Sequence, residues 1–214
     1  MLIRFNFIPM IVALVVAYFA SYEAAGIVLS AMVILYLLPF VFPDKKVDSQ
    51  FNSKALQAIV ATYFPDIVSS VLMFLVTSTK RQAWTEQHVD GASITFTNSM
   101  LSIPSDDLKY VVCHEAAHVL KSHPLLQSLC VIVSGIVLSM CTMIYGKSHW
   151  FWYIVYTGVL FYAINLTIAW LCEIEADIVA CKRIGNTSAI NYMTVYAEKS
   201  VLNKIRLWVI KKVK

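Results

Sequence analysis

Two long apolar runs, at residues 125–145 and 150–171, restrict the folds that this chain of 214 residues can adopt. Each run matches the ~20 residues that a helix needs to cross a bilayer. The short polar break at residues 146–149 predicts a hairpin, so both outer ends should return to the same membrane face. A hydrophobic content of 59% and a mean hydropathy of +0.69 are also too high for an ordinary soluble domain.

A His-Glu-x-x-His pattern lies just before this hairpin and contains His114, Glu115 and His118. On a helix the two histidines are one turn apart on the same face, so their imidazoles can converge on one metal ion. Glu115 lies about 100° around the helix, where it can reach a metal-bound water without completing the ligand set. The spacing is typical of zinc peptidases, in which the glutamate acts on the water.

The residues around this pattern favour a helix over 106–122. Ser105 is a suitable N-cap, and Asp106 and Asp107 place negative charge in the first turn, where the helix dipole favours it. Apolar residues recur at roughly helical spacing, and Pro124 is expected to close the segment.

A third metal ligand has to come from elsewhere in the chain. The metzincin pattern is absent, because Lys121 and Pro124 occupy the positions of its glycine and third histidine. His123 is expected at the helix end, where the dipole favours a cation. Glu173 is the first carboxylate after Glu115, and the hairpin would return it to the same membrane face. A His/His/Glu set leaves a position open for water, as in catalytic zinc sites.

The N-terminal 43 residues are predicted to form another transmembrane hairpin, with spans at 5–20 and 26–42. The alternative is a signal peptide, because Arg4 precedes a good apolar segment. Cleavage after Ala20 would, however, put the bulky Tyr18 at the −3 position, and a second apolar run follows at once.

Residues 44–124 are predicted to form the first part of a catalytic domain. Ser53 is expected to cap a short helix that ends at Tyr63, and residues 67–76 suit a buried strand or core helix. The alternating run 94–97 predicts a strand that either pairs with an extended peptide substrate or lies in the core.

The final segment, 172–214, is predicted to continue the last span as a helix to Arg183, with a stop at Gly185. Asn186 or Thr187 would then cap one amphipathic helix. This helix is expected to pack on the catalytic domain or, alternatively, to lie on an anionic leaflet.

The charges indicate which side of the membrane holds the catalytic domain. Of 17 Lys and Arg, all except Lys147 would lie on one side, so the positive-inside rule places both termini and the motifs in the cytoplasm. Nucleic-acid binding is disfavoured, because no basic stripe with interleaved aromatic residues is present. The five cysteines show no CxxC spacing, which favours a reducing compartment.

The motifs together resemble those of the membrane-integrated gluzincins, the HtpX-type and CAAX prenyl protease family. The resemblance covers about 91–201 and includes His-Glu-Ala-Ala-His and, at 173–177, Glu-Ile-Glu-Ala-Asp. It implies a mainly α membrane protein with about four transmembrane helices and a cytoplasmic α+β gluzincin-type catalytic domain. It also implies one Zn²⁺ per chain, with His114, His118 and Glu173 as ligands and Glu115 as general base.

The second motif contains two further acidic residues. Asp177 follows Glu173 by one turn, and the resemblance implies that it holds a ligand histidine in its tautomer; the alternative is a surface partner for Lys or Arg. Glu175 falls on a variable position of the family pattern and is expected to point elsewhere.

The implied function is a zinc-dependent endopeptidase at the cytoplasmic face of a bacterial inner membrane, acting on damaged or unassembled membrane proteins. Candidate donors to the oxyanion are Tyr192, Tyr196, Arg183 and His123. Alternatives are a regulatory peptidase that cuts one partner and a catalytically silent zinc-binding assembly protein. A site-2-type intramembrane protease is disfavoured, because the motif helix carries several charged residues.

Overall fold

The computed structural model describes residues 54–88 and 91–213, so the predicted hairpin at 1–43 lies outside the described part. The chain divides into two compact units. We call the first the sheet unit; it joins Lys45–Pro124 to Trp170–Lys214. We call the second the hairpin unit; its described part is Leu125–Ala169. Both sequence motifs, at 114–118 and 173–177, fall within the sheet unit.

The sheet unit contains a three-stranded mixed sheet in the order β1-β3-β2. β1 (Val71–Val76) pairs in parallel with β3 (Gly91–Thr97), and β2 (Ala83–His88) pairs with β3 in antiparallel fashion. The predicted strand at 94–97 is therefore the central strand, and its hydrogen-bonding edges are already used by β1 and β2. This arrangement supports the core-strand alternative for this segment and leaves β2 as an outer strand of the described sheet.

The beginning of β3 requires a glycine. Gly91 has φ +147, and a Cβ atom at this position would lie 2.7 Å from the backbone oxygen of Ser70. Any other residue would therefore combine a disfavoured backbone conformation with a clash against main chain. Ser70 closes the 3₁₀ helix Pro65–Ser70, which leads into β1; the predicted run at 67–76 is thus part 3₁₀ helix and part strand.

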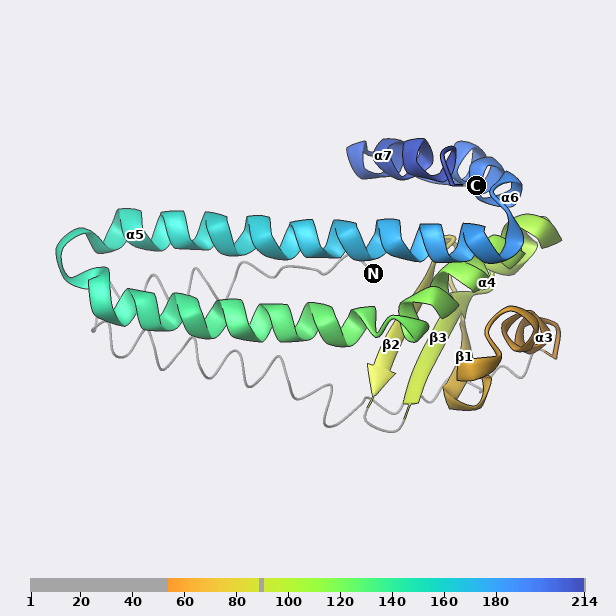
Figure 1. Ribbon diagram of the computed structural model, residues 1–214, viewed down its shortest axis with the longest axis horizontal. Coiled ribbons are helices and arrows are strands. Elements are labelled where there is room, and N and C mark those ends of the chain that lie inside the picture. Colours follow the sequence, from red (N-terminus) through yellow and green to blue (C-terminus); the bar gives the residue numbers. More distant parts are fainter. Residues whose placement is uncertain (1–53, 89–90, 214) are drawn as a thin grey trace. The chain divides into compact units, whose positions relative to one another are not determined.

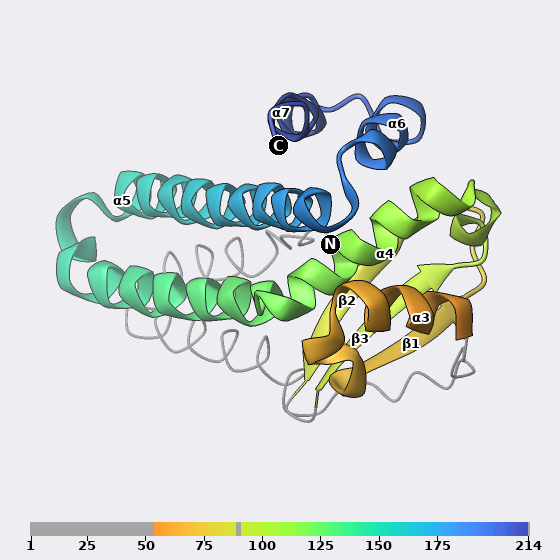
Figure 2. The same ribbon diagram turned by 45° about the vertical axis from the view of Figure 1, so that its right-hand side comes forward.

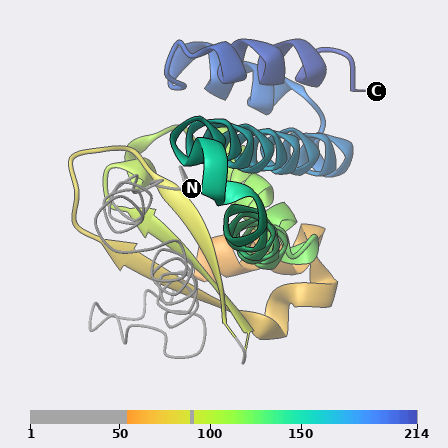
Figure 3. The same cartoon turned by 90° about the vertical axis from the view of Figure 1, so that its left-hand side faces the viewer.

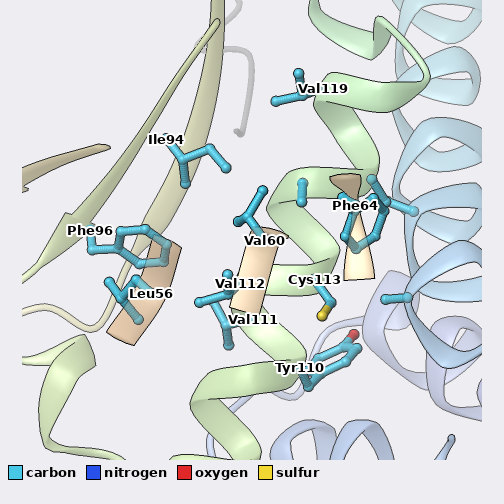
Figure 4. Packing of buried hydrophobic residues seen from close by; sticks show 14 of the residues in the cluster. Leu56, Val60, Phe64, Ile94, Phe96, Tyr110, Val111, Val112, Cys113 and Val119 are labelled. Carbon is cyan, nitrogen blue, oxygen red and sulfur yellow. The ribbon is translucent and has the colours of Figure 1, made fainter. Parts of the chain in front are cut away.

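Two helices pack beside each other against the sheet (Figure 2). α3 (Lys54–Tyr63) buries Leu56 and Val60, which are four residues apart and share one face. Pro65 follows closely and disfavours helical geometry at the residue before it, so the helix ends where the sequence predicts. Figure 4 shows both side chains between the strand residues Ile94 and Phe96 and the helix α4, which spans Ser105–Leu120.

α4 (Ser105–Leu120) is the buried motif helix at the centre of this core. It begins one residue earlier and ends two residues earlier than predicted. Ser105 is its first residue rather than its N-cap; Pro104 holds the cap position and makes no side-chain hydrogen bond. The two aspartates are in the first turn, as expected. After the helix, Ser122 adopts a left-handed conformation with φ 51, which turns the chain.

α5 (His123–Ile184) begins immediately after that turn. Pro124 does not end a helix, as the sequence suggested, but lies within the first turn of the next one, where its missing N–H carries no penalty. Within the hairpin unit α5 doubles back (Figure 1), and its two arms lie side by side when viewed end-on (Figure 3). A hydrogen bond of 3.1 Å from Asn165 Nδ2 to Ser134 Oγ joins the arms.

Among the described residues, Gly158–Ile184 is long and apolar enough to cross a membrane. A second candidate exists if Ser105–Leu120 and His123–Val137, which are bent by 51° relative to each other, are taken as one broken span. Length and composition therefore support one or two spans in the described part of the chain.

The C-terminal segment follows the prediction as far as Gly185, which ends α5 with φ +83. The single amphipathic helix expected next is instead two helices, α6 (Thr187–Val195) and α7 (Val201–Ile210). Ser200 caps α7 by accepting a hydrogen bond from the backbone N–H of Asn203. The chain leaves helical geometry between α6 and α7. The apolar spacing that looked continuous therefore belongs to two separate helices (Figure 1).

Candidate metal centre

Three side chains converge in the sheet unit to form a group that could hold a metal ion: His114, His118 and Glu173. α4 supplies the two histidines and α5 supplies the glutamate. The Nε2 atoms of the histidines are 3.2 Å apart. Glu173 places one carboxylate oxygen 3.4 Å from His114 Nε2 and the other 3.6 Å from His118 Nε2. The structure thus brings Glu173 to two histidines that precede it in the sequence by 55 positions or more.

The chemistry of this donor set fits zinc. Two imidazole nitrogens and one carboxylate are a common protein ligand set for catalytic zinc, which keeps its fourth position open. Both histidines are buried, and all ligand atoms lie within 4.8 Å of one another. Each histidine also directs its Nδ1 atom to a polar partner on the side away from the ligand group, an arrangement usual for metal-bound imidazoles.

Asp177 is the partner of His114. Its Oδ1 atom lies 2.8 Å from His114 Nδ1 and also accepts a hydrogen bond of 2.6 Å from the Tyr110 hydroxyl. The carboxylate is fully buried, so it needs compensation for its lost hydration. Arg206, from α7, provides this with two hydrogen bonds of 2.7 and 2.8 Å. The same guanidinium lies 3.0 Å from Glu173, so it contacts two of the three carboxylates of the second motif.

Burial and the surrounding charges shift the pKa values of the two histidines in opposite directions. Burial lowers the pKa of His114, but Asp177 and Glu173 outweigh burial and raise this pKa to about 9. The pKa of His118 is lowered well below its ordinary value by burial and by the neighbouring His114. In the metal-free protein His118 is therefore neutral at neutral pH, with a nitrogen lone pair available.

Glu115 lies beside the ligand group and is held by β2. Its Oε2 atom accepts a hydrogen bond of 2.7 Å from the Thr85 hydroxyl, which is also 3.1 Å from the Glu115 backbone oxygen. Both residues are buried. One carboxylate oxygen thus has a fixed donor, which restricts the rotation of the side chain.

The oxyanion candidates from the sequence occupy different places. Arg183 donates to the backbone oxygen of Tyr63, and its guanidinium lies 4.4 Å from the centre of the Phe64 ring. Tyr196 lies beneath the guanidinium of Arg81. The pKa of Tyr192 is raised by burial and then by the charge of Glu115. Tyr192 is therefore close enough to Glu115 for the charge of that carboxylate to act on its hydroxyl.

His123 and Glu175 differ from their sequence-based descriptions. His123 was expected at the end of the motif helix, but it is the first residue of α5 and is buried against His118. Glu175 was expected to point elsewhere. It is absent from the ligand group, yet it contacts both His123, at 3.3 Å, and Lys121, at 3.0 Å.

Sequence reasoning missed Arg206, Tyr110 and Thr85. Tyr110 precedes His114 by four residues and therefore shares its helix face, a signal that was present in the sequence. Arg206 was one of several basic residues in the final helix, and nothing in the local pattern distinguished it. Thr85 had no signal, because its contact with Glu115 spans 30 positions and depends on where β2 packs.

Comparison of the sequence with protein-family models gives no match, and comparison with curated proteins gives none either. The site is therefore defined by its own geometry: a buried His/His/Glu group that could bind a metal ion, with a carboxylate held beside it.

Proposed function

We propose that the protein is an integral-membrane zinc-dependent endopeptidase that hydrolyses peptide bonds at the cytoplasmic membrane face. The observation that carries this proposal is the convergence of His114, His118 and Glu173, with Glu115 fixed next to them. A purely structural zinc site would need no adjacent base, whereas a hydrolytic site needs one.

Each part of the site has a role in this proposal. The two histidines and Glu173 would hold one Zn²⁺, which when bound lowers the pKa of a water and polarises the scissile carbonyl. Glu115 accepts a proton from the attacking water and delivers it to the leaving amine. Thr85 keeps the Glu115 carboxylate oriented for both transfers, since its hydroxyl binds one of the two oxygens. Tyr192 is the proposed donor to the oxyanion.

The apolar parts of the chain support a membrane location. The helix Gly158–Ile184 meets the length and hydropathy needed to cross a bilayer. Sixteen of 17 basic residues lie outside the 125–171 hairpin, which supports a cytoplasmic site. Membrane proteins that are damaged or unassembled are then the natural substrates, and a bacterial inner membrane is the proposed location. Four spans in total remain part of this proposal.

The test compares detergent-purified wild type with Glu115→Gln for zinc content and for cleavage of casein and of itself. We expect about one zinc per chain in both proteins, and activity that falls by about 100- to 10,000-fold in the variant, the usual contribution of a general base. Thr85→Val should keep the zinc and lose about tenfold in activity, because it removes one hydrogen bond to a charged group.

The other outcomes separate the alternatives. Zinc in both proteins without activity in either would favour a silent zinc-binding assembly protein. One specific cut in a co-purified partner, with casein untouched, would favour a regulatory peptidase. Absence of zinc under non-chelating conditions would exclude the proposed metallopeptidase.

A further inference from the structure

The Nδ1 atoms of His118 and His114 have different kinds of partner. The Nδ1 atom of His114 meets a buried carboxylate, whereas the Nδ1 atom of His118 lies 2.9 Å from the Nδ1 atom of His123. His123 is 1% exposed, and its ring meets the ring of His118 edge-on, with 4.9 Å between centroids. The left-handed conformation of Ser122 bends the chain directly after α4, so that α5 begins at His123 at an angle of 51° to α4.

The contact continues to a carboxylate at the surface. The Nε2 atom of His123 lies 3.3 Å from Glu175 Oε2, and the other oxygen of Glu175 is 3.0 Å from Lys121 Nζ. The Glu175 and Lys121 side chains are about half exposed, at 49% and 43%. Three residues therefore form a line from the metal group to solvent: His118, His123 and Glu175.

The carboxylate of Glu175, at the surface end of this line, determines which atoms donate and which accept hydrogen bonds along it. An ionised carboxylate only accepts hydrogen bonds, so a neutral His123 must carry its N–H on Nε2. The Nδ1 atom of His123 is then an acceptor, and the short contact requires that His118 carry its own N–H on Nδ1. This leaves the Nε2 atom of His118 with a lone pair directed at Glu173 and His114, which is the form that binds a metal ion.

We propose that His123 and Glu175 are positioning residues that select the Nδ1–H tautomer of His118. The inference rests on the proposed metal site and adds to it the means by which the second histidine is oriented. The chain thus uses two different supports for its two histidines. A buried carboxylate braced by Arg206 holds His114, and an imidazole connected to a surface carboxylate holds His118.

The ion pair between Glu175 and Lys121 is not needed for this selection of the His118 tautomer. Both side chains are well exposed, and exposed pairs of this kind contribute little to stability. Removing Lys121 leaves Glu175 able to accept from His123. The proposal therefore predicts that Glu175 matters and Lys121 does not, although both belong to the same surface contact.

The experiment measures metal affinity and histidine tautomers in the full-length, detergent-purified protein. Zn²⁺ affinity is obtained by chelator competition, and the His118 tautomer by ¹⁵N NMR of metal-free protein labelled at histidine. His123→Leu should weaken Zn²⁺ binding about 10- to 100-fold, the usual effect of removing such a partner. Glu175→Gln should weaken it by about tenfold, because an amide can donate to His123 and reverse the line.

Matched variants test the mechanism. His123→Asn places an amide oxygen near the former Nδ1 position, so it should restore most of the affinity lost in His123→Leu. In that background Glu175→Gln should have no further effect, since the asparagine needs no outer acceptor. Lys121→Met and the exposed Glu198→Gln should each change affinity by less than about fivefold.

The tautomer measurement decides the proposal even without metal. We expect the Nδ1–H form of His118 in the wild type and a mixture in Glu175→Gln, which alters only a half-exposed side chain. An Nε2–H form in the wild type would overturn the proposal, as would equal affinities in wild type, His123→Leu and Glu175→Gln. If the wild type shows the Nδ1–H form but binds no Zn²⁺, the proposed function fails and the tautomer assignment stands.

Discussion

The two units of this protein distribute polar and apolar side chains in opposite ways. The sheet unit buries a conventional apolar core and, next to it, a network of charged residues that compensate one another. In the hairpin unit, large apolar side chains are exposed along both arms of α5: Leu125, Leu126, Leu129, Val133, Ile136, Val137, Met140, Tyr156, Val159, Leu160 and Ile164. The same unit buries the polar side chains of Ser128 and Asn165.

This difference is the one expected if the hairpin unit lies in a bilayer and the sheet unit lies in water, as proposed. In water, a protein places apolar surface inside and rarely exposes long contiguous apolar patches. In a bilayer, apolar side chains face the lipid, and polar groups turn towards a neighbouring helix. The hairpin unit follows the second pattern, whereas the sheet unit buries charge only where hydrogen bonds compensate for it. The comparison supports the proposed membrane location more directly than composition does.

The largest expected effect is in the sheet unit. Arg206→Met should destabilise the metal-free protein by about 3–5 kcal/mol, because it removes the guanidinium that donates two hydrogen bonds to the buried Asp177 carboxylate. Unfolding in mild detergent measures this change. Lys204→Met is the matched control, since Lys204 is on the same helix but exposed, and it should cost less than about 0.5 kcal/mol. Equal effects of the two substitutions would contradict the compensation of buried charge.

A charge on the hairpin tests whether its exposed face meets lipid. Leu160 and Val201 have similar exposed fractions, 59% and 65%, but lie in different units. In bicelles, Leu160→Arg should cost about 2.5–3.5 kcal/mol, the translocon-scale cost of an arginine at the centre of a span, because Leu160 is in the middle of the apolar run 150–171. Val201→Arg, on α7, should stay within about 0.5 kcal/mol. A similar small cost at both positions would mean that the hairpin faces water.

The smallest effect is expected from the hydrogen bond between the hairpin arms. Asn165→Leu should destabilise the protein by only about 0.6 kcal/mol, the average for such bonds in membrane proteins. Ser134 keeps its contacts with the backbone oxygens of Cys130 and Val131, so no polar group is left unpaired. Titration with a denaturing detergent measures the change. A loss above about 2 kcal/mol, more than the largest effect known for such bonds, would contradict this expectation.

Local rules explain much of the metal site. His114 and His118 are one helical turn apart, and so are Glu173 and Asp177, so each motif presents its pair on one helix face wherever a helix forms. The acidic residues in the first turn of α4 and the glycine after α5 likewise mark helix ends through short-range chemistry. Such spacing can be interpreted without knowing what the helix packs against.

The errors came where short-range signals were ambiguous. Apolar spacing across residues 190–209 predicted one helix, but the chain breaks between α6 and α7. Because the apolar residues keep a spacing of three or four across the break, the spacing alone does not reveal it. The roles of His123 and Glu175 were inferred only from their positions along the predicted helices. Their contact joins positions 52 residues apart, and its meaning depends on a third residue, His118.

By itself, the sequence determined the motif helix, the pair of candidate site residues within each motif and the apolar runs, because each depends on a repeat of a few residues along one backbone. Only the tertiary structure decided that Arg206 braces Asp177, that Thr85 holds Glu115 and that β3 is the central strand. Those contacts join residues 29 and 30 positions apart, or a strand to two partners. They follow from which surfaces bury each other when the chain packs, a property of the whole fold that no local pattern contains.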